Sequence, residues 1–362
     1  MSCPHSARNS VLANSLAVTG TLLLATASPA QVVRGATTAV RPPIVTTAPA
    51  ARIVPARLLV ASSAAPMAGG SPLGFTPCTA SGRGTDYPVG PGQPYTSLDA
   101  VPWESLRAGD TVRIHYRDTP YRSKFLLAGQ GTADAPIRVC GVRGPNGERP
   151  VIDGSGATTR AALGPLYSNT PVYSHVHQDR TVIAIKPLAT QAWTAYPRHL
   201  QIDGLKITRG HPNYRYRTAA GVERAYAPFG ACIWIERGQH ITIADNEITD
   251  CQMAVFSKST DDGDFAVTRD LRIAGNRFAG HGIVGDWHEH TTYLQSVGTV
   301  VEFNDYGPLR SGAPGNAIKD RSVGTVIRYN RIEEGAHAID LVEAEDFPGT
   351  ALLSPAYRST HV

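Results

Sequence analysis

The 362-residue sequence contains no uninterrupted apolar run of about 18 residues, so it carries no signal of a membrane-spanning helix. It also lacks a glycine-rich phosphate loop, a GxSxG nucleophile elbow, an HExxH pair and a CxxC pair. These absences leave nucleotide hydrolysis, serine-esterase chemistry, zinc proteolysis and a cysteine-based zinc site without support.

Acidic residues are missing from residues 1–75, which hold five arginines. The other 287 residues carry 29 basic side chains against 30 acidic ones, so the formal net charge of +4 arises in the N-terminal region. Because the body of the chain is near neutral and has no basic stripe, we expect no nucleic-acid partner.

The N-terminal region has the composition of a leader followed by a linker. Arg8 precedes a mostly apolar run from Val11 to Ala25, and small residues suited to cleavage follow. This pattern predicts a signal peptide over residues 1–30, and therefore a secreted or periplasmic protein; a merely disordered tail is the alternative. Residues 31–75 are rich in Ala, Pro and Thr and predict a disordered linker. Residues 76–362 then form one domain, which we expect to be a monomer.

Four cysteines lie beyond the predicted leader: Cys78, Cys140, Cys232 and Cys251. An even number in an exported chain permits disulfides. Their spacing leaves all three pairings open.

A degenerate repeat runs through the second half of the chain. Alternating apolar residues are followed by Asn and another apolar residue, as in Ile241-Thr-Ile-Ala-Asp-Asn-Glu-Ile248. The equivalent positions are Leu205, Asn246, Asn276, Asn304 and Asn330, separated by 41, 30, 28 and 26 residues. Period-two alternation in units this short predicts strands and turns that stack on their neighbours, with the Asn side chains stacked at the turns. Helical repeats are disfavoured because apolar stripes at helical spacing are absent, and a propeller would need four strands in each unit.

We therefore predict an all-β fold, a right-handed single-stranded parallel β-helix (solenoid). The interval of 41 residues indicates an insertion, found in the Tyr- and Arg-rich stretch 211–228. The next register position after Asn330 falls at 356–360, and no closing amphipathic helix follows, so we expect an incomplete or atypical C-terminal cap. This is the pattern of a truncated product or fragment; the alternative is that residues 343–362 fold across the last coil.

Four segments carry a family resemblance: Gly84-Thr-Asp-Tyr-Pro-Val, Ala108-Gly-Asp-Thr-Val-Arg-Ile114, Asn316-Ala-Ile-Lys-Asp-Arg-Ser322 and Val326-Ile-Arg-Tyr-Asn330. Over residues 80–362 the chain resembles secreted bacterial right-handed parallel β-helix proteins of the pectin-lyase-like superfamily. The resemblance implies the fold and a polysaccharide partner. It leaves the reaction open, because this fold hosts lyases, hydrolases, epimerases and non-catalytic adhesins.

A mixed group of charged residues is predicted on neighbouring coils. Lys319 and Tyr293 both lie 11 residues before a register Asn, so we expect them to be neighbours. A strict register with Ile235 turns Lys319 inward, whereas a slip of one residue turns it outward. The expected catalytic residues are Lys319, Arg321 and His290, and the expected substrate-binding residues are Tyr293, Arg328 and Trp287.

In β-helix polysaccharide lyases, Lys and Arg serve as base and as acid or carboxylate clamp, often with calcium. The resemblance therefore implies β-elimination on an acidic (uronate) glycan by Lys319 and Arg321. It also implies a calcium site at Asp340, Glu343 and Glu345. A solvated structural ion network is the alternative interpretation of the same residues.

Two other functions remain open. Asp261, Asp262 and Asp264, with Gly280-His-Gly282, resemble the carboxylates and the Gly-His-Gly of pectin-degrading glycosidases, although the acids lie in a polar loop that could instead be solvated or hold calcium. A non-catalytic glycan-binding or surface protein is the other function. Its candidate groove consists of the aromatic and basic residues of the insertion and three tryptophans: Tyr214, Arg215, Tyr216, Arg217, Tyr226, Trp193, Trp234 and Trp287.

Overall fold

The computed structural model describes residues 77–168 and 176–359. The predicted signal peptide, and the linker up to residue 76, lie outside the described residues. No helix in the described part is long and apolar enough to cross a membrane.

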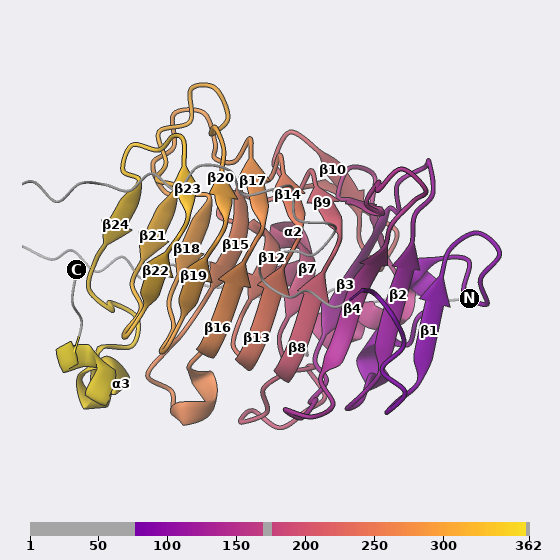
Figure 1. Cartoon of the computed structure of the whole chain (residues 1–362), viewed down its shortest axis with the longest axis horizontal. Helices are drawn as coiled ribbons and strands as arrows, with labels where there is room; N and C mark the ends of the chain where they lie inside the picture. The colour runs from indigo at the N-terminus through magenta and orange to yellow at the C-terminus, as the bar shows by residue number, and fades with distance from the viewer. Residues whose placement is uncertain (1–76, 169–175, 360–362) are drawn as a thin grey trace, which may run out of the picture. The chain divides into compact units, whose positions relative to one another are not determined.

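The described region is built mainly of parallel strands in three sheets (Figure 1). The eight-stranded sheet contains, in spatial order, β1 (Asp86–Val89), β2 (Thr111–His115), β4 (Ile137–Val142), β8 (Arg198–Asp203), β13 (Gln239–Ala244), β16 (Arg269–Ala274), β19 (Val300–Glu302) and β22 (Val326–Arg328). The six-stranded sheet contains β5 (Val151–Asp153), β9 (Lys206–Thr208), β14 (Glu247–Thr249), β17 (Arg277–Ala279), β20 (Asp305–Tyr306) and β23 (Arg331–Ile332).

The third sheet has ten strands. They are β11 (Glu223–Ala225), β10 (Arg215–Arg217), β6 (Thr158–Thr159), β3 (Ser123–Leu127), β7 (Thr181–Ile185), β12 (Ala231–Ile235), β15 (Met253–Ser257), β18 (Thr292–Leu294), β21 (Ile318–Asp320) and β24 (Ile339–Leu341). Among the strands of the described residues, only β10 and β11 pair antiparallel; they lie within the predicted insertion and form a hairpin. The described helices are short: α1 (Gly164–Tyr167), α2 (Val176–Arg180) and α3 (Pro348–Leu353).

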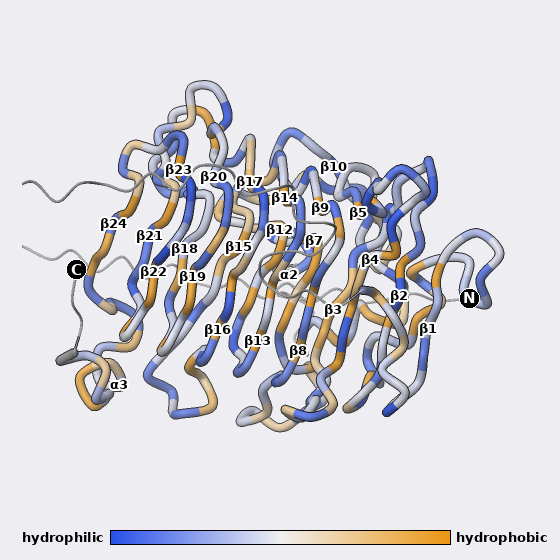
Figure 2. The backbone as a smooth tube through the Cα atoms, viewed as in Figure 1, coloured by the Kyte–Doolittle hydropathy of each residue, from blue (hydrophilic) through white to orange (hydrophobic). Residues whose placement is uncertain are grey.

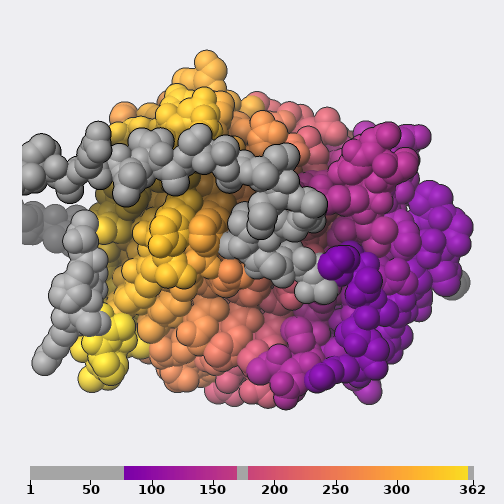
Figure 3. Space-filling model, viewed as in Figure 1, coloured from indigo at the N-terminus to yellow at the C-terminus, as the bar shows by residue number. Residues whose placement is uncertain are grey.

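From β12 onward the chain visits the three sheets in constant rotation, and each turn of chain lies beside the previous one. Figure 3 shows the same progression as successive bands of colour across one face. Ile243, Ile248 and Val255, one from each sheet in the same turn, are all fully buried in one apolar cluster. Apolar colour recurs along the strands of successive turns in Figure 2. The sequence alternation therefore places one face of every sheet against a common core, as a parallel β architecture requires.

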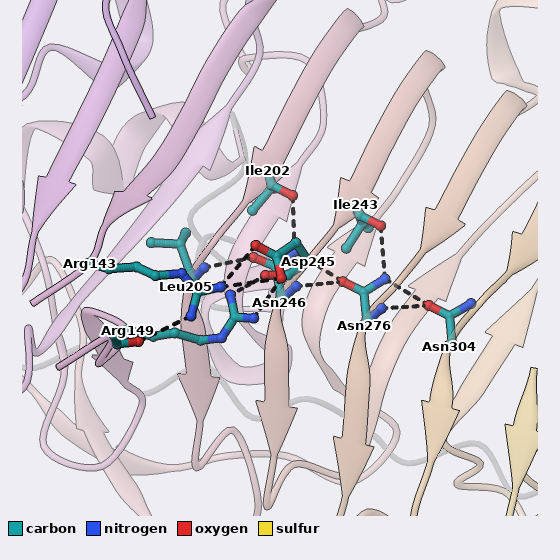
Figure 4. A network of polar contacts seen from close by, with 10 residues as sticks. Arg143, Arg149, Ile202, Leu205, Ile243, Asp245, Asn246, Asn276 and Asn304 are labelled. Atoms are coloured by element: carbon teal, nitrogen blue, oxygen red, sulfur yellow. Dashed lines mark hydrogen bonds and ion pairs between the residues drawn. The ribbon is translucent and has the colours of Figure 1, made fainter. Parts of the chain in front are cut away.

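The predicted asparagine stack lies at the corner between the eight- and six-stranded sheets (Figure 4). The Asn276 side-chain oxygen accepts the backbone N–H and the side-chain amide of Asn246, at 3.0 and 3.2 Å. Asn276 in turn donates its side-chain amide to the Ile243 carbonyl and to the Asn304 side-chain oxygen, at 2.9 and 3.0 Å. Asn304 repeats the pattern with Asn330. The ladder is confirmed, and every buried amide in it is satisfied.

The residue before each ladder position has a left-handed backbone. These residues are Gly204, Asp245, Gly275, Phe303 and Tyr329, with φ between 49° and 73°. Gly and Asp enter this region easily, whereas Phe303 and Tyr329 do so at a steric cost. Their stacked rings, with centroids 4.9 Å apart, offset part of that cost.

The disulfides resolve the pairing that the spacing left open. They join Cys78 to Cys140 and Cys232 to Cys251.

The last turn is incompletely covered. Ile339 and Leu341 of β24 continue inner positions of β21 yet are 42% and 49% exposed. Ala351 of α3, with Ala344 and Phe347 from the segment before the helix, packs in a small separate apolar cluster with Val267 and Val323. Tyr357 lines a hollow of about 790 Å³ beside β24, so the described part of the tail, up to residue 359, covers this end only in part.

Candidate functional site

The outer face of the ten-stranded sheet carries a column of side chains from successive turns. Backbone pairing places Trp234 beside Phe256, Phe256 beside Tyr293, Tyr293 beside Lys319, and Lys319 beside Asp340. The prediction that Lys319 neighbours Tyr293 is confirmed. The strict register with Ile235 was wrong, because the column partner on β12 is Trp234, one residue earlier. This slip turns Lys319 outward and removes the cost of burying its charge in the core.

Lys319 is held by polar neighbours. Its Nζ donates to Asp340 Oδ2 at 3.1 Å and lies 5.9 Å from the centre of the Tyr293 ring. The Asn316 side chain donates to the same Asp340 oxygen at 2.9 Å. The Lys319 side chain keeps 17% of its surface exposed, so the ion pair is partly shielded from solvent but a ligand can still contact it.

His290 adjoins this pair. Its Nδ1 accepts the backbone N–H of Asn316 at 3.0 Å, and its ring contacts the Tyr293 ring edge-on, with centroids 5.6 Å apart. Burial, and then the Lys319 charge, lower the pKa of His290 to about 4. The neutral ring must carry its proton on Nε2, because Nδ1 is an acceptor. His290 is therefore a hydrogen-bond donor at neutral pH.

Arg321 lies two residues after Lys319. It donates to the Glu343 carbonyl oxygen at 3.0 Å and pairs with Glu345 at 2.8 Å. The Glu345 side chain is 66% exposed, so screening makes this pair weak and easily exchanged for another anion. The Arg321 guanidinium is only 15% exposed and keeps its position at the sheet surface.

The three acids expected to bind calcium do not fit a calcium site. Asp340 is engaged by Lys319 and Asn316, and Glu345 by Arg321. Within residues 77–168 and 176–359, no three His, Cys, Asp or Glu side chains gather as a metal site would require.

Of the other expected substrate-binding residues, Arg328 lies on another sheet and Trp287 lies on a loop. Arg328 belongs to β22 of the eight-stranded sheet, where it pairs with Glu302 at 2.8 Å. Arg321 and Arg328 are only seven residues apart in sequence, but the chain passes to another sheet between them. Their closeness in sequence therefore does not bring them into one site. Trp287 is 66% exposed on the loop between β17 and β18.

The structure separates the residues that resembled a glycosidase. Asp261 accepts the backbone N–H groups of Gly349 and Thr350 at 2.8 Å each, and Asp264 pairs with Arg269 at 2.5 Å. His281 is fully buried, with its Nε2 at 3.0 Å from the Ile248 carbonyl oxygen. The acids lie on the turn that follows the ten-stranded sheet, whereas His281 lies on the turn that precedes it. These groups therefore have structural roles.

The aromatic insertion is partly packing, although Tyr214, Arg215 and Arg217 help to line a hollow of about 390 Å³. Tyr216 and Tyr226 are 1% and 2% exposed, and their rings enclose Lys124, whose Nζ lies 4.2 and 4.1 Å from their centres. Burial lowers the pKa of Lys124 well below its usual value. Trp234 is likewise only 4% exposed. Sequence reasoning missed Lys124; a lysine inside the apolar run Ser123-Lys-Phe-Leu-Leu127 was the available signal.

Comparisons with known proteins give weak similarities only. No family model and no curated protein matches the chain. An alginate lyase from Paenibacillus sp. str. FPU-7 is similar in structure, at 14% identity over 63% of this chain and 70% of the other, with a TM-score of 0.34. A GH136 lacto-N-biosidase from Eubacterium ramulus gives 14% identity over 71% of this chain and 53% of the other, with a TM-score of 0.39. A rhamnogalacturonan lyase gives 15% identity over 71% and 65%, with a TM-score of 0.28. At these scores none of the three assigns a function to this chain.

Proposed function

We propose that the described region is a right-handed parallel β-helix that cleaves an acidic, uronate-containing polysaccharide by β-elimination outside the cytoplasm, as a monomer. The rotation of strands through three sheets around one core supports the fold. The carrying observation for the activity is the grouping of Lys319, Arg321, His290 and Tyr293 on one outer sheet face.

β-Elimination requires three catalytic functions: a base, a proton donor and a cation that neutralises the carboxylate. A base removes the proton at C5, the C5–H electrons form the C4=C5 double bond, and the C4–O bond breaks as its oxygen takes a proton. A cation must also neutralise the sugar carboxylate so that negative charge can develop beside it.

The residues of the site can divide these tasks. Arg321 is the carboxylate clamp, because its exposed partner Glu345 is readily replaced by a substrate carboxylate. Lys319 is the proton-transfer group. Its amine form takes the C5 proton, the ammonium form so produced protonates the leaving C4 oxygen, and Asp340 and Asn316 hold the side chain in position. Neutral His290 donates a hydrogen bond from Nε2 to a sugar oxygen, and Tyr293 borders the sugar beside Lys319.

The test is the absorbance of the unsaturated uronate during incubation with alginate, pectate and glycosaminoglycans. We expect a rise with one of them, and a loss of at least a hundredfold in rate for Lys319→Ala and for Arg321→Ala. Lys206→Ala is the matched control, since Lys206 is also ion-paired, at 2.7 Å to Glu247, but lies on the six-stranded sheet.

Three outcomes would contradict the proposal. No absorbance rise with any of the polymers would exclude the lyase. New reducing ends without that absorbance would indicate hydrolysis. Full activity of both variants would place the reaction elsewhere.

Non-catalytic glycan binding is the second candidate. Trp193, 69% exposed, is the observation that favours it, because an exposed indole can stack on a sugar ring. Glycan binding without cleavage by the wild-type chain would support this alternative.

A further inference from the structure

A second pocket lies on the ten-stranded sheet, away from Lys319. It has a volume of about 270 Å³, room for one sugar-sized ligand. Its wall includes Tyr167, Lys186, Trp193, Glu236 and Arg237. Lys186 follows β7, and β7 lies four strand spacings, or about 19 Å, from β21, which carries Lys319.

The pocket contains two buried cations that share one nearby acid, Glu236, and form no salt bridge among the described residues. Lys186 and Arg237 are each only 7% exposed. Lys186 donates to the carbonyl oxygens of Tyr167 and Pro187, at 2.9 and 2.8 Å, and Arg237 donates to the carbonyl oxygen of Trp193 at 2.5 Å. Among the described residues, neither forms an ion pair with a carboxylate, and the Arg237 Nε has no hydrogen-bond acceptor.

Glu236, the acid in the pocket wall, is already engaged. Its two oxygens accept from Lys258 Nζ at 3.0 Å and from Trp234 Nε1 at 2.9 Å. The wall as a whole therefore has an excess of positive charge. Burial lowers the pKa of Lys186 to about 8, which is the response of an ammonium group that lacks sufficient compensating charge.

An indole forms the rim of the same pocket. Trp193 is 69% exposed, and its ring centre lies 4.9 Å from the Arg237 guanidinium carbon. A buried cation is costly unless it is paired, and an anion entering the pocket would supply the missing charge. A flat ring beside that anion could cover the exposed face of Trp193.

We propose that this pocket binds a carboxylate-bearing sugar, with the carboxylate against Lys186 and Arg237 and the ring on Trp193. The proposal rests on the proposed function, since it makes the pocket a remote subsite for the acidic glycan. An oligosaccharide, but not a monosaccharide, would span from this pocket to Lys319.

The binding experiment uses the full chain and single sugars. Galacturonate and glucuronate are titrated by calorimetry beside their neutral counterparts galactose and glucose, and beside inorganic phosphate. We expect the uronates to bind at least tenfold more tightly than the neutral sugars and phosphate. Arg237→Gln should weaken uronate binding at least tenfold, and Trp193→Ala should weaken it severalfold.

Arg331→Gln is the matched control, because Arg331 is exposed, lies on the six-stranded sheet and pairs with Asp305. It should bind the uronates as the wild type does. If Arg237→Gln fails to fold, the exposed Trp193 still provides the test. Equal binding of the neutral sugars, unchanged binding by Trp193→Ala, or phosphate binding as tight as uronate binding would each overturn the proposal.

The lyase assay separates this proposal from the proposed function. Uronate binding that depends on Arg237 and Trp193, without any unsaturated product, would support the pocket as a uronate site and refute the lyase proposal. Cleavage that depends on Lys319, without uronate binding at the pocket, would do the reverse.

Discussion

Replacing His281 by Gln should make the protein less sensitive to acid. His281 is fully buried, and burial lowers its pKa to about 4 from 6.5. In the unfolded chain the ring binds a proton below pH 6.5, whereas the folded protein keeps it neutral down to about pH 4. The contribution of this neutral ring to the free energy of unfolding is therefore fully present above pH 6.5 and is lost as the pH falls toward 4.

The magnitude follows from the two pKa values. At pH 5 the unfolded state gains about 2 kcal/mol from protonating this ring, while the folded state gains almost nothing. Gln has no such titration, and its side-chain N–H can still donate to the Ile248 carbonyl oxygen that His281 contacts at 3.0 Å. Between pH 7.5 and pH 5, the variant should thus lose about 2 kcal/mol less stability than the wild type.

Urea unfolding at pH 7.5, 6 and 5, followed by tryptophan fluorescence, measures this difference. The comparison of slopes cancels whatever the substitution costs at neutral pH. His240→Gln is the control for the loss of a histidine at a site that is not buried, because the His240 side chain is 47% exposed. Equal slopes for His281→Gln and the wild type would refute the claim that burial holds this ring neutral.

The remaining predictions concern the scaffold. Asn276→Ala should lower the free energy of unfolding by about 3–5 kcal/mol, because it leaves buried ladder partners without hydrogen bonds. Asn330→Ala should lower it less, because Asn330 is only half-buried at the end of the ladder. Equal losses of the two variants in denaturant unfolding would contradict the ladder argument. Removing the Cys78–Cys140 disulfide, which spans 62 residues, should lower the free energy of unfolding by about 4 kcal/mol. Removing Cys232–Cys251, which spans 19 residues, should lower it by about 3 kcal/mol. The reverse order of unfolding midpoints would argue against loop entropy as the cause. Asp261→Ala should speed hydrogen exchange of the first amides of α3 without changing exchange in β13, and unchanged exchange at Gly349 and Thr350 would refute the capping role.

The sequence predicted the architecture better than the site. Alternating apolar residues and a regularly spaced Asn are properties of each turn alone, so the parallel strands and the ladder at Asn246, Asn276 and Asn304 could be read without coordinates. Closure of the sheets into a right-handed solenoid stays a prediction.

The site depended on register, which local patterns do not determine. A shift of one residue on β12 exchanged Ile235 for Trp234 in the outer column and turned Lys319 outward. Arg328 was misplaced because a corner between sheets lies between it and Arg321. The pocket at Lys186 and Arg237 could not be predicted, since it depends on which cations are buried together without a salt bridge, a property of the assembled structure.

The pairing of neighbouring turns does not depend on the number of residues between their strands. Between Leu205 and Asn246 the chain inserts a hairpin, and yet β9 and β14 pair residue for residue as β14 and β17 do. The tip of this hairpin, residues 218–222, can therefore change in length without shifting the turns above and below it, provided that Tyr216 and Tyr226 still enclose Lys124. For protein engineering this makes the tip between β10 and β11 a grafting position, where a new recognition loop could be installed at the edge of the ten-stranded sheet while the ladder keeps its register.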